Sequence, residues 1–117
     1  MTASHYKLDK VCAIVDFNGM QIDGFCCDVK DMKPYAKKWE DFGWHAIEIN
    51  GHDFSKLMDA FDIAETIKKK PQIIIAHTVK GKGISFIENQ VKWHGIVPKK
   101  DELKRALKEL DEEATKL

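Results

Sequence analysis

The fold is decided by the stretch Pro71-Gln72-Ile73-Ile74-Ile75-Ala76, in which a run of apolar residues closely follows a proline. A second run of the same kind, Val11-Cys12-Ala13-Ile14-Val15, stands near the start of the chain. Short β-branched runs that are apolar at every position are typical of strands covered on both faces, as in a parallel sheet. A third strand is predicted over residues 45–49, where isoleucines alternate with a glutamate.

Helical patterns lie between and after these strands. Asp31 can cap a helix over residues 31–42, with a proline tolerated in its first turn and Gly43 ending it. Asp53 can cap a second helix. Three lysines at the end of this helix favour its dipole, and Pro71 stops it. The apolar face predicted for this helix comprises Phe54, Leu57, Met58, Phe61 and Ala64.

A last helix is predicted from about Asp101, with Leu103, Leu107 and Leu110 on one side. The resulting order of elements is β-α-β-α-β-α. Short alternating units of this kind predict an α/β fold with three αβα layers, a mostly parallel sheet and right-handed crossovers.

The 117 residues contain no repeat and no linker-like segment, so a single domain over residues 1–117 is predicted. Three strands make a small sheet, because most sheets have more. Residues 1–8 have two interpretations: the tail of a helix within a larger, partial domain, or the frayed start of a small one.

Composition excludes several classes of protein. Nineteen basic residues balance nineteen acidic ones, which argues against nucleic-acid binding or a membrane-surface patch. The apolar runs are far shorter than the ~20 residues of a membrane helix, and no signal segment opens the chain. Three cysteines form neither a disulfide framework nor a metal set, so we expect a soluble, cytoplasmic protein with reduced thiols.

Polar, glycine-rich segments follow each predicted strand, and ligands of parallel α/β sheets bind beyond the carboxyl ends of the strands. Asn18-Gly19 follows the first strand, Asn50-Gly51 the second, and Lys80-Gly81-Lys82-Gly83 the third, with Trp93-His94-Gly95 further on. The sequence therefore predicts that these segments collect at one edge of the sheet.

Each segment has an ordinary interpretation beside a functional one. Asn18 offers an amide oxygen of the kind that Mg²⁺ or Ca²⁺ binds, but Asn-Gly after a strand is commonly just a turn. Lys80 and Lys82 among glycines suit a phosphate, although the spacing is not that of a P-loop, and a solvated loop is the alternative. His94 beside Trp93 can move a proton near neutral pH or be structural.

The remaining residues are interpreted structurally, with His52 the leading exception because it follows a strand. These are the cysteines Cys26 and Cys27, the histidines His5, His45 and His77, and the aromatic residues Trp39, Phe42 and Trp44. Residues 99–116 mix both signs of charge at helical spacing, which predicts a solvated helix with ion pairs.

Ordered motifs over nearly the whole chain resemble transketolases. They are Leu8-Asp9-Lys10-Val11-Cys12-Ala13-Ile14-Val15-Asp16-Phe17-Asn18-Gly19-Met20-Gln21-Ile22-Asp23-Gly24, Gly43-Trp44-His45-Ala46-Ile47-Glu48-Ile49-Asn50-Gly51-His52-Asp53, Ala76-His77-Thr78-Val79-Lys80-Gly81-Lys82-Gly83 and Trp93-His94-Gly95. The chain resembles the later part of the family's N-terminal, diphosphate-binding half, which is a separate subunit in split transketolases.

The resemblance implies a thiamine diphosphate-binding fold and specific roles. Asn18 would give its side-chain oxygen, and Met20 its backbone carbonyl, to Mg²⁺ (or Ca²⁺), while Ile22 would lie against the thiamine diphosphate. Lys80 and His94 would approach the diphosphate, and His94 would also face the sugar as the catalytic residue. The implied reaction is the pentose phosphate pathway transfer of a two-carbon ketol unit from a ketose phosphate to an aldose phosphate, in an oligomer.

The resemblance also implies partners. The family's Gly-Asp-Gly metal motif, its early histidines and its cofactor-activating glutamate are not in this sequence. The expected partners are the remaining part of the N-terminal half carrying Gly-Asp-Gly, the C-terminal transketolase subunit or half, and sugar phosphates. The isolated chain is expected to be inactive.

Other interpretations stay open. One is a non-catalytic truncated fragment that acts as an assembly element. Another is a different thiamine diphosphate enzyme, a deoxyxylulose phosphate synthase or a two-oxoacid dehydrogenase subunit. Lys80-Gly81-Lys82-Gly83 together with Trp93-His94-Gly95 favours transketolase over these.

Overall fold

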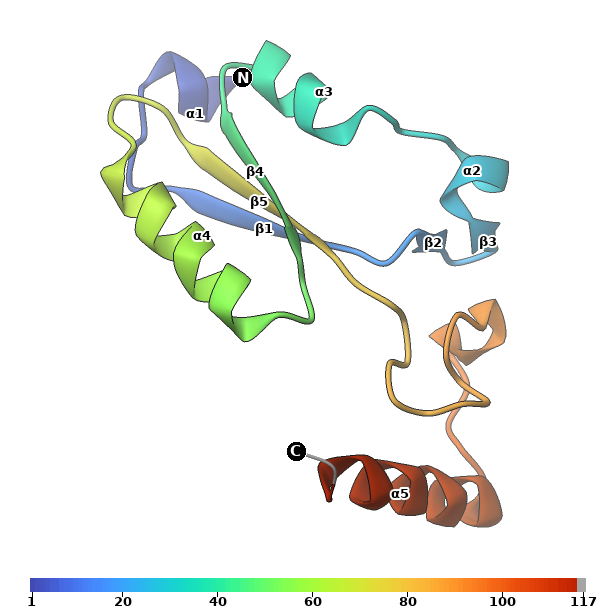
Figure 1. Ribbon diagram of the computed structural model, residues 1–117. Helices are drawn as coiled ribbons and strands as arrows, with labels where there is room; N and C mark the ends of the chain where they lie inside the picture. Colours follow the sequence, from blue (N-terminus) through green and yellow to red (C-terminus); the bar gives the residue numbers. More distant parts are fainter. Residues whose placement is uncertain (116–117) are drawn as a thin grey trace. The chain divides into compact units, whose positions relative to one another are not determined.

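A computed structural model describes residues 1–115 of the chain (Figure 1). The described residues form two compact units. The first, here called the sheet unit, comprises Met1–Asn18 and Lys30–Thr78. The second, the loop unit, comprises Gly19–Val29 and the described residues from Val79 onward. No helix among residues 1–115 combines the length and the apolar character that a membrane crossing requires.

The sheet unit contains the three predicted strands, which run parallel in the order β1-β5-β4 (Figure 1). They are β1 (Cys12–Phe17), β4 (His45–Asn50) and β5 (Gln72–His77). Helices flank this sheet, so the predicted αβα fold class is confirmed. The strands are in register, with Phe17 and Asn50 both opposite His77 at their last positions.

The central strand β5 is covered on both faces, as its sequence predicts. Ile73, Ile74 and Ile75 are each 0% exposed. The same prediction is wrong for β1, where exposure alternates along the strand and Ile14 is 55% exposed. The physical reason is position: β1 is an edge strand of the sheet formed by the described residues, whereas β5 has a neighbour on each side.

The first predicted interstrand helix ends where the sequence indicates, but it begins later. This helix is α3 (Tyr35–Asp41), which follows Pro34. A separate short helix, α1 (Thr2–His5), lies at the start of the chain. Asp31 does not cap α3; its carboxylate accepts from the backbone N–H of Lys33 at 3.0 Å instead. A residue before proline avoids the helical region, so the helix begins only after Pro34. Gly43 does end it, at φ +83°, with its N–H donating to Glu40 O at 2.8 Å.

Helix α4 (Phe54–Thr66) begins as predicted, because the Asp53 carboxylate accepts from the backbone N–H of Lys56 at 3.1 Å. Its predicted apolar face is partly wrong. The small residues Ala60 and Ala64 are buried, whereas the large Phe54 is 84% exposed. Met58 and Phe61 are exposed as well. The helix ends at Thr66, so the three lysines expected in its last turn and the Pro71 expected to stop it lie beyond its end.

The loop unit is built from short elements and one long helix. The sequence patterns did not predict the hairpin of β2 (Met20–Gln21) with β3 (Gly24–Phe25), the helix α2 (Cys26–Val29) or the 3₁₀ helix η1 (Val91–His94). Helix α5 (Lys100–Ala114) confirms the predicted last helix, and its Arg105–Glu109 and Lys108–Glu112 pairs confirm the predicted ion pairing. Leu103, Leu107 and Leu110 are all exposed.

Candidate functional site

The carboxyl edge of the sheet is polar and internally paired. The ring of His77 makes a hydrogen bond with the Glu48 carboxylate at 2.7 Å and lies edge-on to Phe17, with ring centroids 5.2 Å apart. The Thr78 hydroxyl donates to the Asp16 carboxylate across the β1–β5 pair. Because β1 and β5 end in register, Asn18 and Thr78 leave the sheet at the same edge, as predicted.

The first candidate segment leaves β1 through Asn18 and turns back on itself at once. Gly19 adopts φ +74°, a left-handed conformation that glycine reaches without strain, and its carbonyl accepts from the Cys26 N–H at 2.8 Å. Met20 then lies in β2 of the hairpin, opposite Phe25. Ile22 occupies the two-residue turn between β2 and β3 and is 69% exposed.

The second candidate segment follows β5 and carries Lys80. Consecutive turns fold residues 79–90, and the carbonyl of Lys80 accepts from the backbone N–H of Asn89 at 3.0 Å. Gly81 has φ +69°, and a Cβ built there would lie 2.4 Å from Ile87 Cγ2, so the turn depends on glycine. Lys82 pairs with Glu88 at 3.7 Å. Lys80 itself is half-buried.

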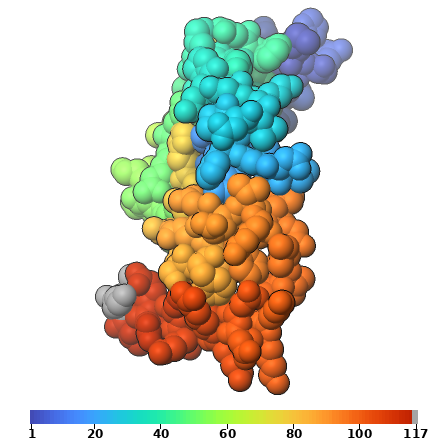
Figure 2. All heavy atoms as spheres, turned by 90° about the vertical axis from the view of Figure 1, so that its right-hand side faces the viewer, coloured from blue at the N-terminus to red at the C-terminus, as the bar shows by residue number. Residues whose placement is uncertain are grey.

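His94 is the last residue of η1 and is exposed. The preceding residue, Trp93, is anchored: its indole N–H donates to the Phe86 carbonyl at 3.1 Å, and the two rings meet edge to face at 5.7 Å. Lys92 places its ammonium 5.3 Å from the Trp93 ring centroid. Parts of the segment from Val79 to Lys100, orange in Figure 2, lie at the surface of the loop unit, His94 among its exposed residues.

The predicted site residues are thus distributed over both units. Asn18 is the last residue of the first part of the sheet unit, whereas Met20, Ile22, Lys80 and His94 all belong to the loop unit. Within residues 1–115 no group of three or more His, Cys, Asp or Glu side chains is arranged to hold a metal. The metal donors expected from this chain, an amide oxygen and a backbone carbonyl, are not of those types.

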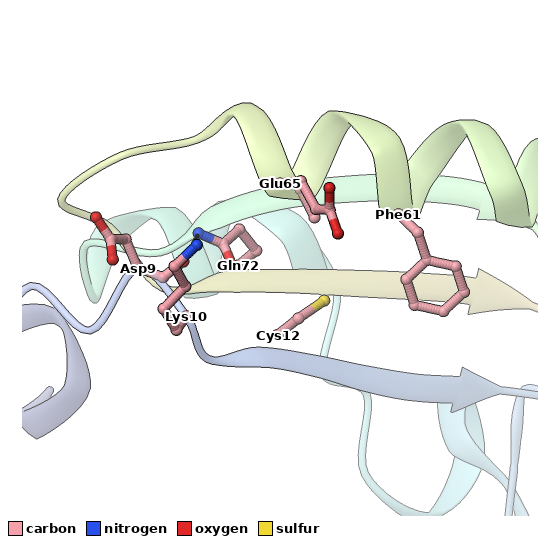
Figure 3. A pocket seen from close by; sticks show the side chains of 7 residues that line it. Asp9, Lys10, Cys12, Phe61, Glu65 and Gln72 are labelled. Atoms are coloured by element: carbon pink, nitrogen blue, oxygen red, sulfur yellow. Dashed lines mark hydrogen bonds between the residues drawn. The ribbon is translucent and has the colours of Figure 1, made fainter.

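A hollow of about 260 Å³ in the sheet unit contains none of the predicted site residues (Figure 3). It lies at the amino ends of β1 and β5, at the opposite end of the strands from Asn18. Its lining is Asp9, Lys10, Cys12, Phe61, Ala64, Glu65 and Gln72. Burial raises the pKa of the Cys12 thiol, which disfavours a reactive thiolate there.

A family profile described as "Transketolase, thiamine diphosphate binding domain" matches residues 1–116. The chain belongs to the transketolase family. The match follows the whole course of the sequence, including both glycine-rich segments, so it covers every predicted site residue of this transketolase-family chain.

Relatives from two bacteria share a large part of this sequence. An apulose-4-phosphate transketolase subunit of Phocaeicola vulgatus is 37% identical over 117 residues, which are 100% of this chain and 42% of that protein. The protein of the same name from Actinobacillus succinogenes is 43% identical over 113 residues, which are 97% of this chain and 41% of that protein. The chain therefore spans about two fifths of the length of these relatives.

The fold is likewise that of transketolases. The crystal structure of transketolase from Campylobacter jejuni superposes with a TM-score of 0.84 and 30% sequence identity. The superposition covers 92% of this chain and 17% of that one. It supports a thiamine diphosphate-binding domain of transketolase type for the matched region.

Two clusters near the candidate segments were missed in the sequence. The His77–Glu48 pair joins neighbouring strands 29 residues apart, and only the strand register, which the sequence does not give, would have revealed it. A second cluster joins Ser85 to Arg105 and Glu109 on α5. The spacing of Arg105 and Glu109 signals a helical ion pair, but nothing in the spacing points to Ser85.

Proposed function

We propose that this chain is a component of a transketolase that uses thiamine diphosphate to transfer a two-carbon ketol unit from a ketose phosphate to an aldose phosphate, a reaction of the pentose phosphate pathway. The observation that carries the proposal is the family match over residues 1–116. It is supported by the common sheet edge from which the Asn18 and Lys80 segments depart.

The chain's contribution to the metal is two neutral oxygen donors, the Asn18 side chain and the Met20 carbonyl. Oxygen donors fit a hard divalent cation, Mg²⁺ or Ca²⁺, which takes six or more ligands, so this pair fits as part of a larger set. The diphosphate and an acidic residue of a partner chain would complete it. When bound, thiamine diphosphate supplies the carbanion chemistry, and the protein supplies orientation and electrostatics.

Charge supports a diphosphate beside Lys80 and His94. Residues 79–100 contain five lysines and one glutamate, so this segment attracts anions. Lys80 would hold a phosphate oxygen, and His94 would face both the diphosphate and the sugar, where its ring can hold or donate a proton. The exposed Ile22 offers an apolar contact to the cofactor rings.

The proposal includes other polypeptides, because the relatives are themselves named as subunits. We propose as partners the remaining part of the N-terminal half, carrying Gly-Asp-Gly, and the C-terminal transketolase subunit or half. On the exposed side of β1, Ile14 is 55% exposed and offers apolar surface that such a chain could cover. We propose that residues 1–117 act as a partial domain that is inactive without the groups that these partners supply.

A cytoplasmic location is part of the same proposal. The cysteines Cys12, Cys26 and Cys27 are all free thiols. Free thiols are in keeping with a reducing compartment.

A second candidate function is that of a non-catalytic assembly element. The observation that favours it is the apolar surface of the sheet unit, where Phe54, Met58 and Ile14 are more than half exposed. Such a surface suits packing against partner chains whether or not a cofactor is held.

One variant pair separates the two functions. Asn18→Ala removes the proposed metal oxygen, whereas Thr66→Ala removes a side-chain oxygen at the end of α4, outside every candidate segment, and serves as the control. The variants are mixed with the two complementing chains, thiamine diphosphate and Mn²⁺, and both ketol transfer and Mn²⁺ retention through gel filtration are measured. The transketolase proposal predicts that only Asn18→Ala loses both.

Asn18→Asp, which keeps an oxygen ligand, should retain Mn²⁺. If Asn18→Ala keeps full activity and full Mn²⁺ retention, the catalytic proposal is refuted and the assembly function is favoured. Complexes that form normally but never show ketol transfer, beside an active full-length transketolase, lead to the same conclusion.

A further inference from the structure

Three side chains of the loop unit form a closed ring of hydrogen bonds, here called the clasp: Ser85, Arg105 and Glu109. Glu109 Oε2 accepts from the Ser85 backbone N–H at 2.6 Å, and Glu109 Oε1 accepts from the Ser85 hydroxyl at 2.9 Å. Arg105 Nε donates to the same Oε1 at 2.9 Å, and Arg105 Nη2 donates to the Ser85 hydroxyl at 2.9 Å. The clasp therefore ties the loop after β5 to helix α5.

The clasp differs from an ordinary surface ion pair. Both Glu109 oxygens are engaged and its side chain is 23% exposed, whereas the neighbouring Lys108–Glu112 pair is 3.6 Å apart with a glutamate 61% exposed. The Ser85 backbone N–H above all, then the Ser85 hydroxyl and Arg105, lower the pKa of Glu109. A carboxylate held by several donors, one of them a backbone N–H, fixes the geometry of the loop.

The clasp reaches the candidate histidine through two aromatic rings. The Arg105 guanidinium carbon lies 4.6 Å from the centroid of the Phe86 ring, next to Ser85 in the chain. Phe86 in turn holds Trp93 twice, by the edge-to-face ring contact and by the hydrogen bond from the indole N–H to its carbonyl. Trp93 directly precedes His94, so a continuous series of contacts runs from α5 to His94.

We propose that Arg105 and Glu109 are positioning residues that hold Ser85 and Phe86, and through them Trp93, and so fix where His94 presents its ring. The role given to His94 rests on the proposed function, whereas the positioning is a property of this chain alone. His94 lies exposed at the end of one short 3₁₀ turn, which by itself holds a side chain loosely. Displacing a reacting or binding group by about 1 Å can cost roughly a hundredfold in rate.

The test uses the full chain and nuclear magnetic resonance at fixed neutral pH. Glu109→Ala removes the acceptor of the clasp, and Glu112→Ala removes an equal charge from the same helix without touching the loop. Glu109→Ala should shift the Trp93 indole N–H and the His94 resonances and should speed exchange of the Ser85 amide roughly tenfold. Glu112→Ala should change none of these.

Two conservative variants keep the test decisive if Glu109→Ala fails to fold, which far-ultraviolet circular dichroism checks. Glu109→Gln retains an acceptor oxygen and should shift the Trp93 indole N–H resonance less than Glu109→Ala does. Arg105→Lys keeps the charge but lacks the planar guanidinium group that bridges two acceptors. It should therefore also shift the Trp93 indole N–H resonance. If every folded variant leaves the Trp93 and His94 resonances as in Glu112→Ala, the positioning inference is overturned.

A second measurement tests the consequence for binding, in the assembly with the two complementing chains and Mg²⁺, with inorganic pyrophosphate as the probe. Glu109→Ala should raise its Kd several-fold, and Glu112→Ala should not. If the unchanged chain does not bind pyrophosphate, the proposed function loses support while the resonance result still decides the positioning. If His94 shifts but pyrophosphate binds equally well, the binding role of the positioning is refuted.

Discussion

Ile14 and Ile74 face each other in the register of β1 and β5, yet only Ile74 is buried, at 0% exposure against 55%. They are the same residue type on neighbouring strands of one sheet. Truncating each to alanine therefore compares the stability that a side chain contributes on the edge strand β1 with what it contributes on the central strand β5. We expect Ile74→Ala to destabilise the chain far more than Ile14→Ala.

The magnitude follows from burial. Ile→Ala removes three carbons, and a buried carbon contributes about 0.8 kcal/mol, so the transfer cost at Ile74 is about 2.4 kcal/mol. The cavity left between two flanking strands adds to this, for a total of about 3–4 kcal/mol. Ile14 is 55% exposed, so less than half of the transfer cost applies and no enclosed cavity forms; about 1 kcal/mol is expected.

The assay is urea denaturation of the isolated chain, followed by far-ultraviolet circular dichroism and by tryptophan emission. The free energy of unfolding of a typical domain is about 5–15 kcal/mol. The loss expected for Ile74→Ala should therefore lower the urea midpoint strongly, whereas the loss expected for Ile14→Ala should lower it only slightly. Equal losses for the two variants, within about 0.5 kcal/mol, would refute the reasoning, because β1 would then be covered on both faces.

The remaining predictions concern the loops and helix ends. Gly81→Ala should cost about 1–2 kcal/mol more than Gly95→Ala, because Gly81 has φ +69° and a close neighbour while Gly95 has open space; denaturation compares the two. Asp53→Ala should cost about 1 kcal/mol by removing the cap of α4, measured in the same way. The Glu109 pKa is lowered, so its contacts stabilise the loop at neutral pH and are lost only as pH falls through that lowered value. The Ser85 amide resonance should therefore move only in acid below the usual glutamate range, and a transition at or above that range would contradict this.

The strands could be predicted from sequence because each is a short apolar run, but their order could not. The run around Ile74 and the run around Ile14 look alike, and pairing in the folded sheet decides which is central. The helical repeat of apolar residues along α4 includes both large and small side chains. The buried ones are the small Ala60 and Ala64, which allow the helix to lie close to the sheet, whereas the large Phe54 is exposed.

The common edge from which the candidate segments leave the sheet was predictable for a simple reason: parallel strands end at one edge, and the segments follow the strand ends. The supporting contacts were not predictable. Ser85 lies 24 residues from Glu109, and only the folding of residues 79–95 brings them together. The helix spacing of Arg105 and Glu109 is visible in the sequence, but its role at the loop is not.

The central claim is that this chain supplies part of a metal and diphosphate site in an assembled transketolase. Native mass spectrometry of the chain mixed with the two complementing chains, thiamine diphosphate and Mg²⁺ tests it most directly. The account predicts an assembly that contains this chain and retains the cofactor. The Asn18→Ala variant should form the same assembly but should not retain the cofactor. If the 13.4 kDa chain stays alone, or associates only with itself and without cofactor, the account is contradicted.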